Sequence, residues 1–460
     1  MAHNTVVEAD RNAPAVTQAL AEFVANHPSR GWSDAVEHEA HRTFFNWLGC
    51  AIGAANHPAM LAALAAVREF DPPSQAAVLG RSDRVDMGGA ALLNGISSHI
   101  FDYDDTHLRT IIHPAGPVAP ALLALAEKTG ASGRELIDAL VLGVDVSCRI
   151  GNMIYPEHYD RGWHITGSTG MFGAAAGCAR LLKLDARATQ MALGIAASQP
   201  VGLREQFGTM TKPFHPGAAA RAGLTSAMLA RHGFTASPRA IEAPRGFAQV
   251  ASTKFDWSQI TDALGKRFEI STNTYKPFAC GIVIHPSIDA CVQFRDNHGI
   301  QPDDVARIEL QVHSLVLELT GNTAPRNGLE AKFSVYHASA AGMMFGAAGE
   351  AQFADDIVNR PDVIALREKI VASANDQIDE ASVDATLFCK DGRKIRLFVE
   401  RAIGSVEKPM TDVDLEDKFS SLVVPVLGAS NASELKSRWR LLGEAPDVRQ
   451  LVASATLSSF

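Results

Sequence analysis

Apolar residues recur at helical spacing along the first 267 residues of the chain. Phe44, Trp47, Leu48 and Ile52 follow this spacing after Ser33, which predicts a helix over 33–54 with Ser33 as its N-cap. The same pattern predicts helices over 14–26, 87–100, 117–128, 133–150, 166–182, 185–198 and 216–232. Several stretches, such as 136–146 and 171–179, are apolar on nearly every side, which is typical of helices in the middle of a bundle. Small residues around Gly173 would let two helix backbones approach closely.

After about residue 267 the period of the pattern changes to two. Ile308, Leu310 and Val312 alternate with polar residues, which indicates a half-buried strand. A second alternation, of residues 386 and 388 and then 395, 397 and 399, brackets Asp391-Gly392 and predicts a type I′ hairpin. Helices are predicted beside these strands over 286–297 and 329–345, and the chain is predicted to be helical again over 412–427, 432–442 and 447–454.

These patterns predict a fold that is mainly α with an α+β part. We expect a large all-helical domain, residues 1–267, which the C-terminal segment 401–460 completes. A smaller α+β lid domain, residues 268–400, is expected to be inserted between them. The length of 460 residues and the 47% of hydrophobic residues suffice for two large domains.

Charge and cysteine usage restrict the partners and the compartment. The 42 Lys and Arg residues face 51 Asp and Glu, so the net charge of −9 argues against nucleic acid and membrane surfaces as partners. A small anionic ligand needs only a local cationic pocket. The six cysteines stand singly in apolar surroundings, which favours buried, reduced thiols. Segment 1–15 has no apolar core of a signal peptide, and we expect a cytoplasmic protein.

Three carboxylates, Asp102, Asp104 and Asp105, follow a mostly apolar predicted helix and precede His113. Like charges so close together raise the pKa of one carboxyl group, which suits an acid or a base, or they bind a cation. A solvated helix end is the alternative, although acids are unfavourable at that end of the helix dipole. A metal-dependent hydrolase built on these residues and His113 also stays open.

Two further groups of polar residues stand at the starts of predicted helices, where free N–H groups suit a carboxylate ligand. His164 precedes a glycine-rich apolar helix and is able to move protons at neutral pH. Lys212 lies with Thr211 and His215 before the next helix, and a lysine among cations in a dry pocket can become a base. The alternatives are a structural histidine and a solvated surface lysine.

A fourth group contains Lys276, Cys280 and His285, and for Cys280 we favour inert packing. The sequence contains no GxGxxG after a strand, no Walker loop, no HExxH and no GxSxG. The interpretation that remains is a cofactor-independent site of histidines, lysine and carboxylate that receives a small polyanion.

In this order, the groups resemble the MmgE/PrpD family, whose members include 2-methylcitrate dehydratase, cis-aconitate decarboxylase and iminodisuccinate epimerase. The resemblance rests on Asp102–Thr106, His113–Gly116, Gly162–His164, Thr211–His215, Lys276-Pro277 with His285, and Glu330–Ser334. It implies a helical domain with an α+β lid, usually as a homodimer, and no organic cofactor. We also expect no metal, because the histidine pairs 107 and 113, and 158 and 164, lack the rest of a zinc ligand set.

The decarboxylase branch implies active-site roles for Asp102, Thr106, His113, His164, Lys212 and His285, and an aromatic lining residue near Tyr336 or His337. We therefore predict two sets of site residues. The catalytic set is Asp102, His164, Lys212 and His285, and the substrate-binding set is Thr106, His113, Thr211, His215, Lys276 and Tyr336.

The predicted activity is that of a lyase, a dehydratase or a decarboxylase, acting on a small di- or tricarboxylic acid by proton transfer at the carbon next to a carboxylate. An epimerase of a dicarboxylate is the alternative, because 158–164 and 207–212 look closer to the epimerase. A carboxylate-binding protein without turnover also stays open.

Overall fold

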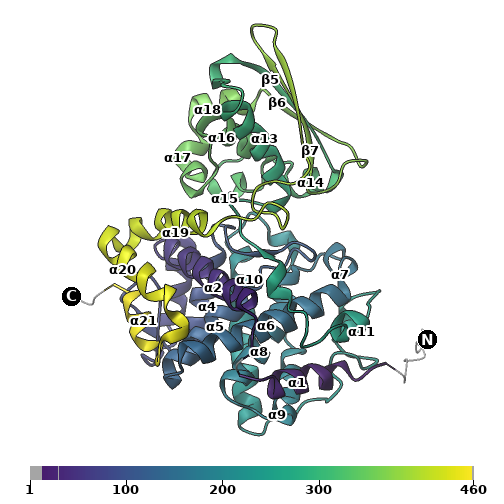
Figure 1. Cartoon of the computed structure of the whole chain (residues 1–460), viewed down its shortest axis with the longest axis vertical. Helices are drawn as coiled ribbons and strands as arrows, with labels where there is room; N and C mark the ends of the chain where they lie inside the picture. Colours follow the sequence, from purple (N-terminus) through teal and green to yellow (C-terminus); the bar gives the residue numbers. More distant parts are fainter. Residues whose placement is uncertain (1–12, 30, 458–460) are drawn as a thin grey trace.

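The computed structural model describes residues 13–29 and 31–457. Residues 1–12 lie outside the described residues. They make up most of segment 1–15, in which the sequence shows no apolar core of a signal peptide. A large helical body and a smaller α+β lobe stand one above the other (Figure 1). The fold class is thus mainly α with an α+β part, as predicted, whereas the domain boundaries at 267 and 400 stay predictions.

The apolar pattern predicted most helices of the helical body to within a few residues, but it missed those over 58–68, 157–160, 247–251 and 258–261. Ser33 caps α2 by accepting a hydrogen bond from the Val36 N–H, and Ser132 and Glu135 form a capping box at the start of α6. The helices are α1 (Val16–Asn26), α2 (Asp34–Gly53), α3 (Pro58–Arg68), α4 (Met87–His99), α5 (Ala115–Thr129), α6 (Gly133–Ile154), α7 (Glu157–Asp160), α8 (Ile165–Leu181), α9 (Ala186–Ala196), α10 (Thr211–Arg231), α11 (Phe247–Ala251) and α12 (Ser258–Thr261).

Helix α8 lies in the centre of the body and packs against both α6 and α10. Fifteen of its residues, Ile165 to Ala179, are buried. A Cβ at Gly173 would come within 2.6 Å of the Gly143 carbonyl oxygen of α6, so only glycine allows this approach. The prediction that small residues let these backbones pack closely is confirmed.

The upper lobe contains a four-stranded sheet with the order β6-β5-β7-β8. Strand β5 (Val305–Val312) pairs in parallel with β6 (Ile370–Ala374) and antiparallel with β7 (Val383–Cys389), which pairs antiparallel with β8 (Lys394–Val399). Ile308, Leu310 and Val312 are buried, as their alternation predicted. The accompanying helices are α13 (His285–Asp296), α14 (Ser314–Thr320), α15 (Gly328–Ala331), α16 (Val335–Phe345), α17 (Asp355–Val358) and α18 (Pro361–Arg367). Two-stranded pairs, β1 (Ala76–Ala77) with β2 (Arg84–Val85) and β3 (Thr106–His107) with β4 (Asn273–Thr274), lie outside this sheet.

The C-terminal segment returns to the helical body, where it forms the yellow helices α19 (Asp412–Leu427), α20 (Ala429–Arg440) and α21 (Arg449–Ser454) in Figure 1. The ring of Phe419 stacks on Phe45 of α2 with centroids 4.3 Å apart, and Trp439 stacks on Phe44 at 5.2 Å. The C-terminal helices therefore complete the core that the first helices begin.

Several local predictions were wrong. Helix α10 starts at Thr211 rather than at Pro216, because Pro213 already occupies the first turn, where a helix needs no N–H donor. The segment 329–345 forms two helices, α15 and α16, because Ser334 caps the second one through the His337 N–H. Strand β6 was missed.

The hairpin at Asp391-Gly392 is confirmed, but its turn is not type I′. Residues 390–392 form a three-residue loop, closed by the Cys389 N–H on the Arg393 carbonyl oxygen, in which Gly392 takes a φ of +90°. Strand β7 buries Val383, Ala385 and Leu387, so the alternation of residues 386 and 388 belongs to the other face.

Among the described residues, no single helix has the length and apolar character needed to cross a membrane, although α2 and α3, bent by 85° at their junction, meet that requirement jointly by length and composition alone.

Candidate active site

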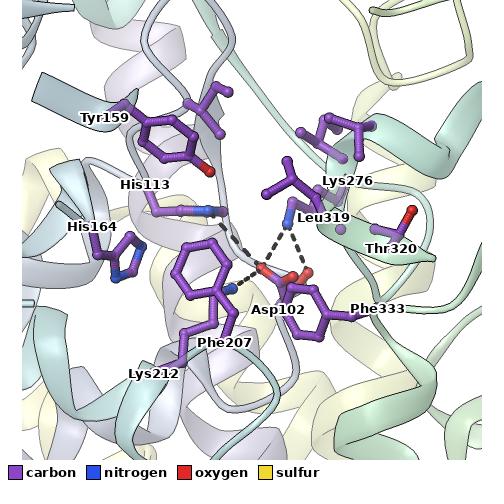
Figure 2. Close-up of a pocket in the computed structure, with 14 residues that line it drawn as sticks. Asp102, His113, Tyr159, His164, Phe207, Lys212, Lys276, Leu319, Thr320 and Phe333 are labelled. Carbon is purple, nitrogen blue, oxygen red and sulfur yellow. Dashed lines mark hydrogen bonds and ion pairs between the residues drawn. The ribbon is translucent and has the colours of Figure 1, made fainter. Parts of the chain in front are cut away.

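A pocket with about 450 Å³ of empty space, part of it open solvent, lies where the helical body meets the α+β lobe. Figure 2 shows that its polar side chains converge from several separate segments. The body contributes Asp102, Ile111, His113, Tyr159, His164, Phe207 and Lys212, and the chain from the junction onward contributes Lys276, Gly281, Ile282, Val283, Leu319, Thr320 and Phe333.

Asp102 is the centre of the polar cluster. Its Oδ1 atom lies 2.9 Å from Lys212 Nζ and 2.8 Å from Lys276 Nζ (Figure 2). Asp102 has a φ of +50°, an uncommon conformation that aims the carboxylate back towards both lysines. Burial alone would raise the pKa of Asp102, but the two ammonium groups outweigh burial and hold the pKa well below its usual range. Asp102 is therefore ionised.

Lys212 stands in the first turn of α10 and is almost fully buried. Its ammonium group lies 5.2 Å from the ring centre of Phe207 and 5.1 Å from that of Phe333, so two aromatic faces flank the charge. Burial lowers the pKa of Lys212, Asp102 opposes this shift, and Lys276 adds to it. Lys212 is therefore able to bind an anion through its positive charge, and its lowered pKa makes it easier to deprotonate than an exposed lysine.

His113 is fixed by the loop that carries the three aspartates. Its Nδ1 atom donates to the Asp105 carbonyl oxygen at 2.8 Å and lies 3.3 Å from Asp104 Oδ1. Its Nε2 atom lies 4.0 Å from Asp102 Oδ1 and its ring lines the pocket. The Asp105 carboxyl binds the Ala115 N–H and Asn273 instead, and burial together with Asp104 raises the pKa of Asp105 to about 7.

His164 precedes α8 and lines the pocket next to His113, across from Lys276 (Figure 2). Its Nδ1 atom lies 2.9 Å from His215 Nδ1, so one ring donates and the other accepts. Burial, with the neighbouring His99 and Lys212, holds the pKa of His164 well below its ordinary value, and burial lowers the pKa of His215 to about 4. Both imidazoles are neutral at physiological pH.

Half of the ten predicted site residues line the pocket, namely Asp102, His113, His164, Lys212 and Lys276. Two more lie behind the lining residues. His215 contacts His164, and the Thr106 hydroxyl lies 3.5 Å from His113 Nδ1. Thr211 is exposed, and Tyr336 is half-buried on α16 outside the lining. His285 starts α13, fully buried beside Phe278, and is also outside the lining.

Three lysines donate hydrogen bonds to backbone carbonyl oxygens at the junction between the helical body and the α+β lobe. Lys276 Nζ also binds the Asp102 and Cys280 carbonyl oxygens, at 3.0 and 3.1 Å. Lys418, from the C-terminal α19, donates to the Tyr103 and Lys276 carbonyl oxygens at 2.5 and 2.9 Å, and Lys332 donates to the Ala279 carbonyl oxygen at 2.8 Å. Lys418 was not predicted, yet its helical spacing with buried Leu415 and Leu422 was a visible signal.

Tyr159, Phe207 and Phe333 also line the pocket without having been predicted as site residues. All three lie within stretches that carried the family resemblance, 158–164, 207–212 and 330–334. Proximity to a motif was therefore the available signal. His99, which contacts His113 and His164, stands at the end of an apolar helix and gave no signal beyond its polarity.

The acidic cluster was also considered above as a metal site. One ligand atom from each of His99, Asp102, Asp104 and His113 lies within 4.8 Å of the others. However, Lys212 and Lys276 place two ammonium groups within 2.9 Å of Asp102 Oδ1, where they neutralise the carboxylate and would repel a divalent cation. These residues do not fit a metal centre.

Comparison with protein families finds two matching domains. Residues 18–260 match the MmgE/PrpD N-terminal domain, and residues 278–441 match the MmgE/PrpD C-terminal domain. The chain belongs to the MmgE/PrpD family. The junction between the two family domains contains Lys276, which reaches back to Asp102 of the first domain.

The relatives match most of the chain. A cis-aconitate decarboxylase-like protein of Aspergillus oryzae is 26% identical over 95% of this chain and 96% of its own length. Cis-aconitate decarboxylase of Aspergillus terreus is 26% identical over 97% of both chains, and that of Homo sapiens is 27% identical over 72% of this chain and 71% of its own. The protein is accordingly an enzyme of the lyase type.

Proposed function

We propose that the protein is a cofactor-independent lyase that acts on a small di- or tricarboxylic acid by proton transfer at a carbon next to a carboxylate. The observation that carries this proposal is the Asp102 carboxylate held between Lys212 and Lys276 in a pocket that two histidines also face.

The charges of this cluster suit a carboxylate substrate. Within this cluster, two ammonium groups and one carboxylate leave a net positive charge on side chains that are almost fully buried. A substrate carboxylate takes up this excess charge, and the same cations stabilise the negative charge that develops on it during the reaction. Because the cations are already in place, no reorganisation is needed when that charge appears.

The chemistry needs a group that moves a proton, and the pocket offers His164, which is neutral, and Lys212, whose pKa is lowered. In decarboxylation the electron pair of the breaking C–C bond passes to the carbon, carbon dioxide leaves, and a proton takes its place. In dehydration a base removes the proton next to the carboxylate, and hydroxide leaves with a proton from an acid. Both reactions use the same two groups.

The experiment is turnover of cis-aconitate and 2-methylcitrate, followed by proton NMR. The names of the full-length relatives make cis-aconitate the first compound to test, with carbon dioxide and a five-carbon unsaturated diacid as products. Lys212→Ala and His164→Gln should each lower kcat about 100-fold or more. The control is Lys183→Ala, an exposed lysine paired with Glu135. Unchanged turnover in both site variants would remove the proposed site.

Epimerisation is the second candidate, favoured by the likeness of 158–164 and 207–212 to the epimerase branch. It has no leaving group, because the proton returns to the other face of the same carbon. Incubation in deuterated water separates the two activities. An epimerase exchanges the proton next to the carboxylate without a new product, whereas a lyase produces carbon dioxide or water.

We further propose a cytoplasmic homodimer. All six cysteines are buried free thiols, which suits a reducing compartment. The dimer is an expectation from the family resemblance, and light scattering on the purified protein measures it directly.

A further inference from the structure

Two aspartates of the same loop, Asp102 and Asp104, have opposite surroundings. Asp102 binds two lysines, whereas Asp104 faces two histidines, with its Oδ2 atom 2.8 Å from His99 Nδ1 and its Oδ1 atom 3.3 Å from His113 Nδ1. In the described part of the chain, no lysine or arginine lies within 4.0 Å of the Asp104 carboxylate. Asp104 is fully buried, and His99 and His113 hold its pKa well below the usual range against the effect of burial.

The hydrogen bonds fix the proton positions on both histidines. An ionised carboxylate only accepts, so His99 carries its proton on Nδ1. His113 Nδ1 faces the Asp105 carbonyl oxygen and Asp104, both acceptors, so it also carries the proton. In the neutral ring the Nε2 atom of each histidine is then free of a proton, and the His113 ring lines the pocket.

His99 connects the two histidines of the pocket although it does not line the pocket itself. Its ring meets His113 edge to face with centroids 4.6 Å apart and stacks on His164 at 5.6 Å. His99 is fully buried, burial lowers its pKa to about 4, and its Nε2 atom has no hydrogen-bond partner among the described residues. Both pocket histidines, His113 and His164, therefore pack against the neutral ring of His99, which is hydrogen-bonded to Asp104.

We propose that Asp104 and His99 are positioning residues for the proton-transfer step. The negative charge of Asp104 favours the tautomer in which His113 Nδ1, already bound to the Asp105 carbonyl oxygen, carries the proton. The same charge offsets the imidazolium formed when a pocket histidine takes a proton, and His99 links Asp104 to the rings of His113 and His164. This inference rests on the proposed function. It divides the site into a positive side, Asp102 with its lysines, that binds carboxylates, and a negative side, Asp104 with His99 and His113, that stabilises a protonated pocket histidine such as His164.

The test compares Asp104→Asn with Asp105→Asn. The two residues are neighbours, both are fully buried, and the Asp105 carboxyl binds Ala115 and Asn273 rather than a histidine. Asp104→Asn keeps an oxygen acceptor but removes the charge, so kcat should fall about 100-fold or more with KM within about threefold of wild type. Asp105→Asn should keep kcat within about threefold.

A second pair of variants tests His99. His99→Asn places an amide N–H close to the position of Nδ1, so the bond to Asp104 is kept, whereas His99→Phe has a ring but no donor. We expect His99→Phe to lower kcat at least tenfold and His99→Asn to recover part of this loss. Equal kcat values for Asp104→Asn and Asp105→Asn would overturn the proposal, and so would a loss that appears only as a higher KM.

A measurement on the wild-type protein separates this inference from the proposed function. Histidine labelled with ¹⁵N in the ring reports by NMR which ring nitrogen carries the proton, with His99→Phe and His113→Gln assigning the signals. Protons on the Nδ1 atoms of both histidines support the inference even if no carboxylic acid is turned over, which would refute the proposed function alone. A proton on His113 Nε2 in the neutral ring would refute the inference whatever the activity.

Discussion

Replacing Asp102 by asparagine should destabilise the protein more than any single lysine replacement in the same cluster. D102N removes one negative charge and leaves two buried ammonium groups, Lys212 and Lys276, facing a neutral amide. Lys212→Met leaves Asp102 still paired with Lys276. The two substitutions therefore differ in the number of buried charges that lose their partner.

The contact distances set the size of this effect. At 2.8 and 2.9 Å, and with an effective dielectric constant of about 20, each contact contributes about 6 kcal/mol of Coulomb attraction, most of which offsets the desolvation of the buried charges. Removing one partner of a buried pair costs about 3–5 kcal/mol, which is the loss expected for D102N. For the double variant with Lys212→Met we expect a coupling energy of about 1–3 kcal/mol, because one orphaned cation is removed.

Chemical unfolding of the four proteins, followed by circular dichroism, measures the coupling without any assay of activity. The matched control is the exposed pair Lys183 and Glu135, whose coupling energy should stay below about 1 kcal/mol. If the two substitutions in the buried cluster add independently, or couple no more strongly than the exposed pair, the three charges do not depend on one another and the electrostatic account of the pocket is wrong.

Three further outcomes are expected. Burial and Asp104 raise the pKa of Asp105 from its ordinary value of 3.8 to about 7 in the folded protein, so the folded state binds this proton more tightly than the unfolded state. Wild type should therefore lose stability relative to Asp105→Asn as pH rises from about 4 to 7, and the difference in melting temperature should level off above pH 7. Chelation with EDTA should leave turnover unchanged, because two ammonium groups already neutralise Asp102; a chelator-sensitive activity restored by zinc or manganese contradicts this. Phe419→Ala should lower the free energy of unfolding by about 3–5 kcal/mol, because the buried Phe419 ring stacks on Phe45 and its removal leaves a cavity between α19 and α2. Calorimetric melting measures the loss, and a change below about 1 kcal/mol refutes the packing argument.

The helical body was predictable because its signals are local. Ser33 and the apolar spacing after it mark α2 within one residue at each end, and the all-round apolar stretch around Gly173 correctly indicated a central helix. Strand β5 was equally visible in its alternation. Strand β6 was missed because only its first residue, Ile370, is buried, so no alternation of apolar and polar residues is present.

The site was only partly predictable, because its contacts are made across long stretches of chain. Asp102, Lys212 and Lys276 each stood out as polar residues at element ends, yet no sequence pattern states that one carboxylate oxygen receives both ammonium groups. The position of His285 behind the pocket lining depends on how α13 packs beneath Phe278, which is a tertiary property. Lys418 is 142 residues from its partner Lys276, so only the fold brings them together.

The Lys418 contact has a consequence for how the protein is made. Its ammonium group donates hydrogen bonds to the backbone carbonyl groups of Tyr103 and Lys276. Tyr103 follows Asp102 in the chain, and Lys276 is one of the two cations that Asp102 binds. During synthesis these hydrogen bonds can form only after Lys418 has left the ribosome, and Lys418 follows Phe333, the last residue that lines the pocket, by 85 residues. A nascent chain that ends between Phe333 and Lys418 would contain every pocket-lining side chain but would lack the Lys418 hydrogen bonds that fix the backbone beside the pocket.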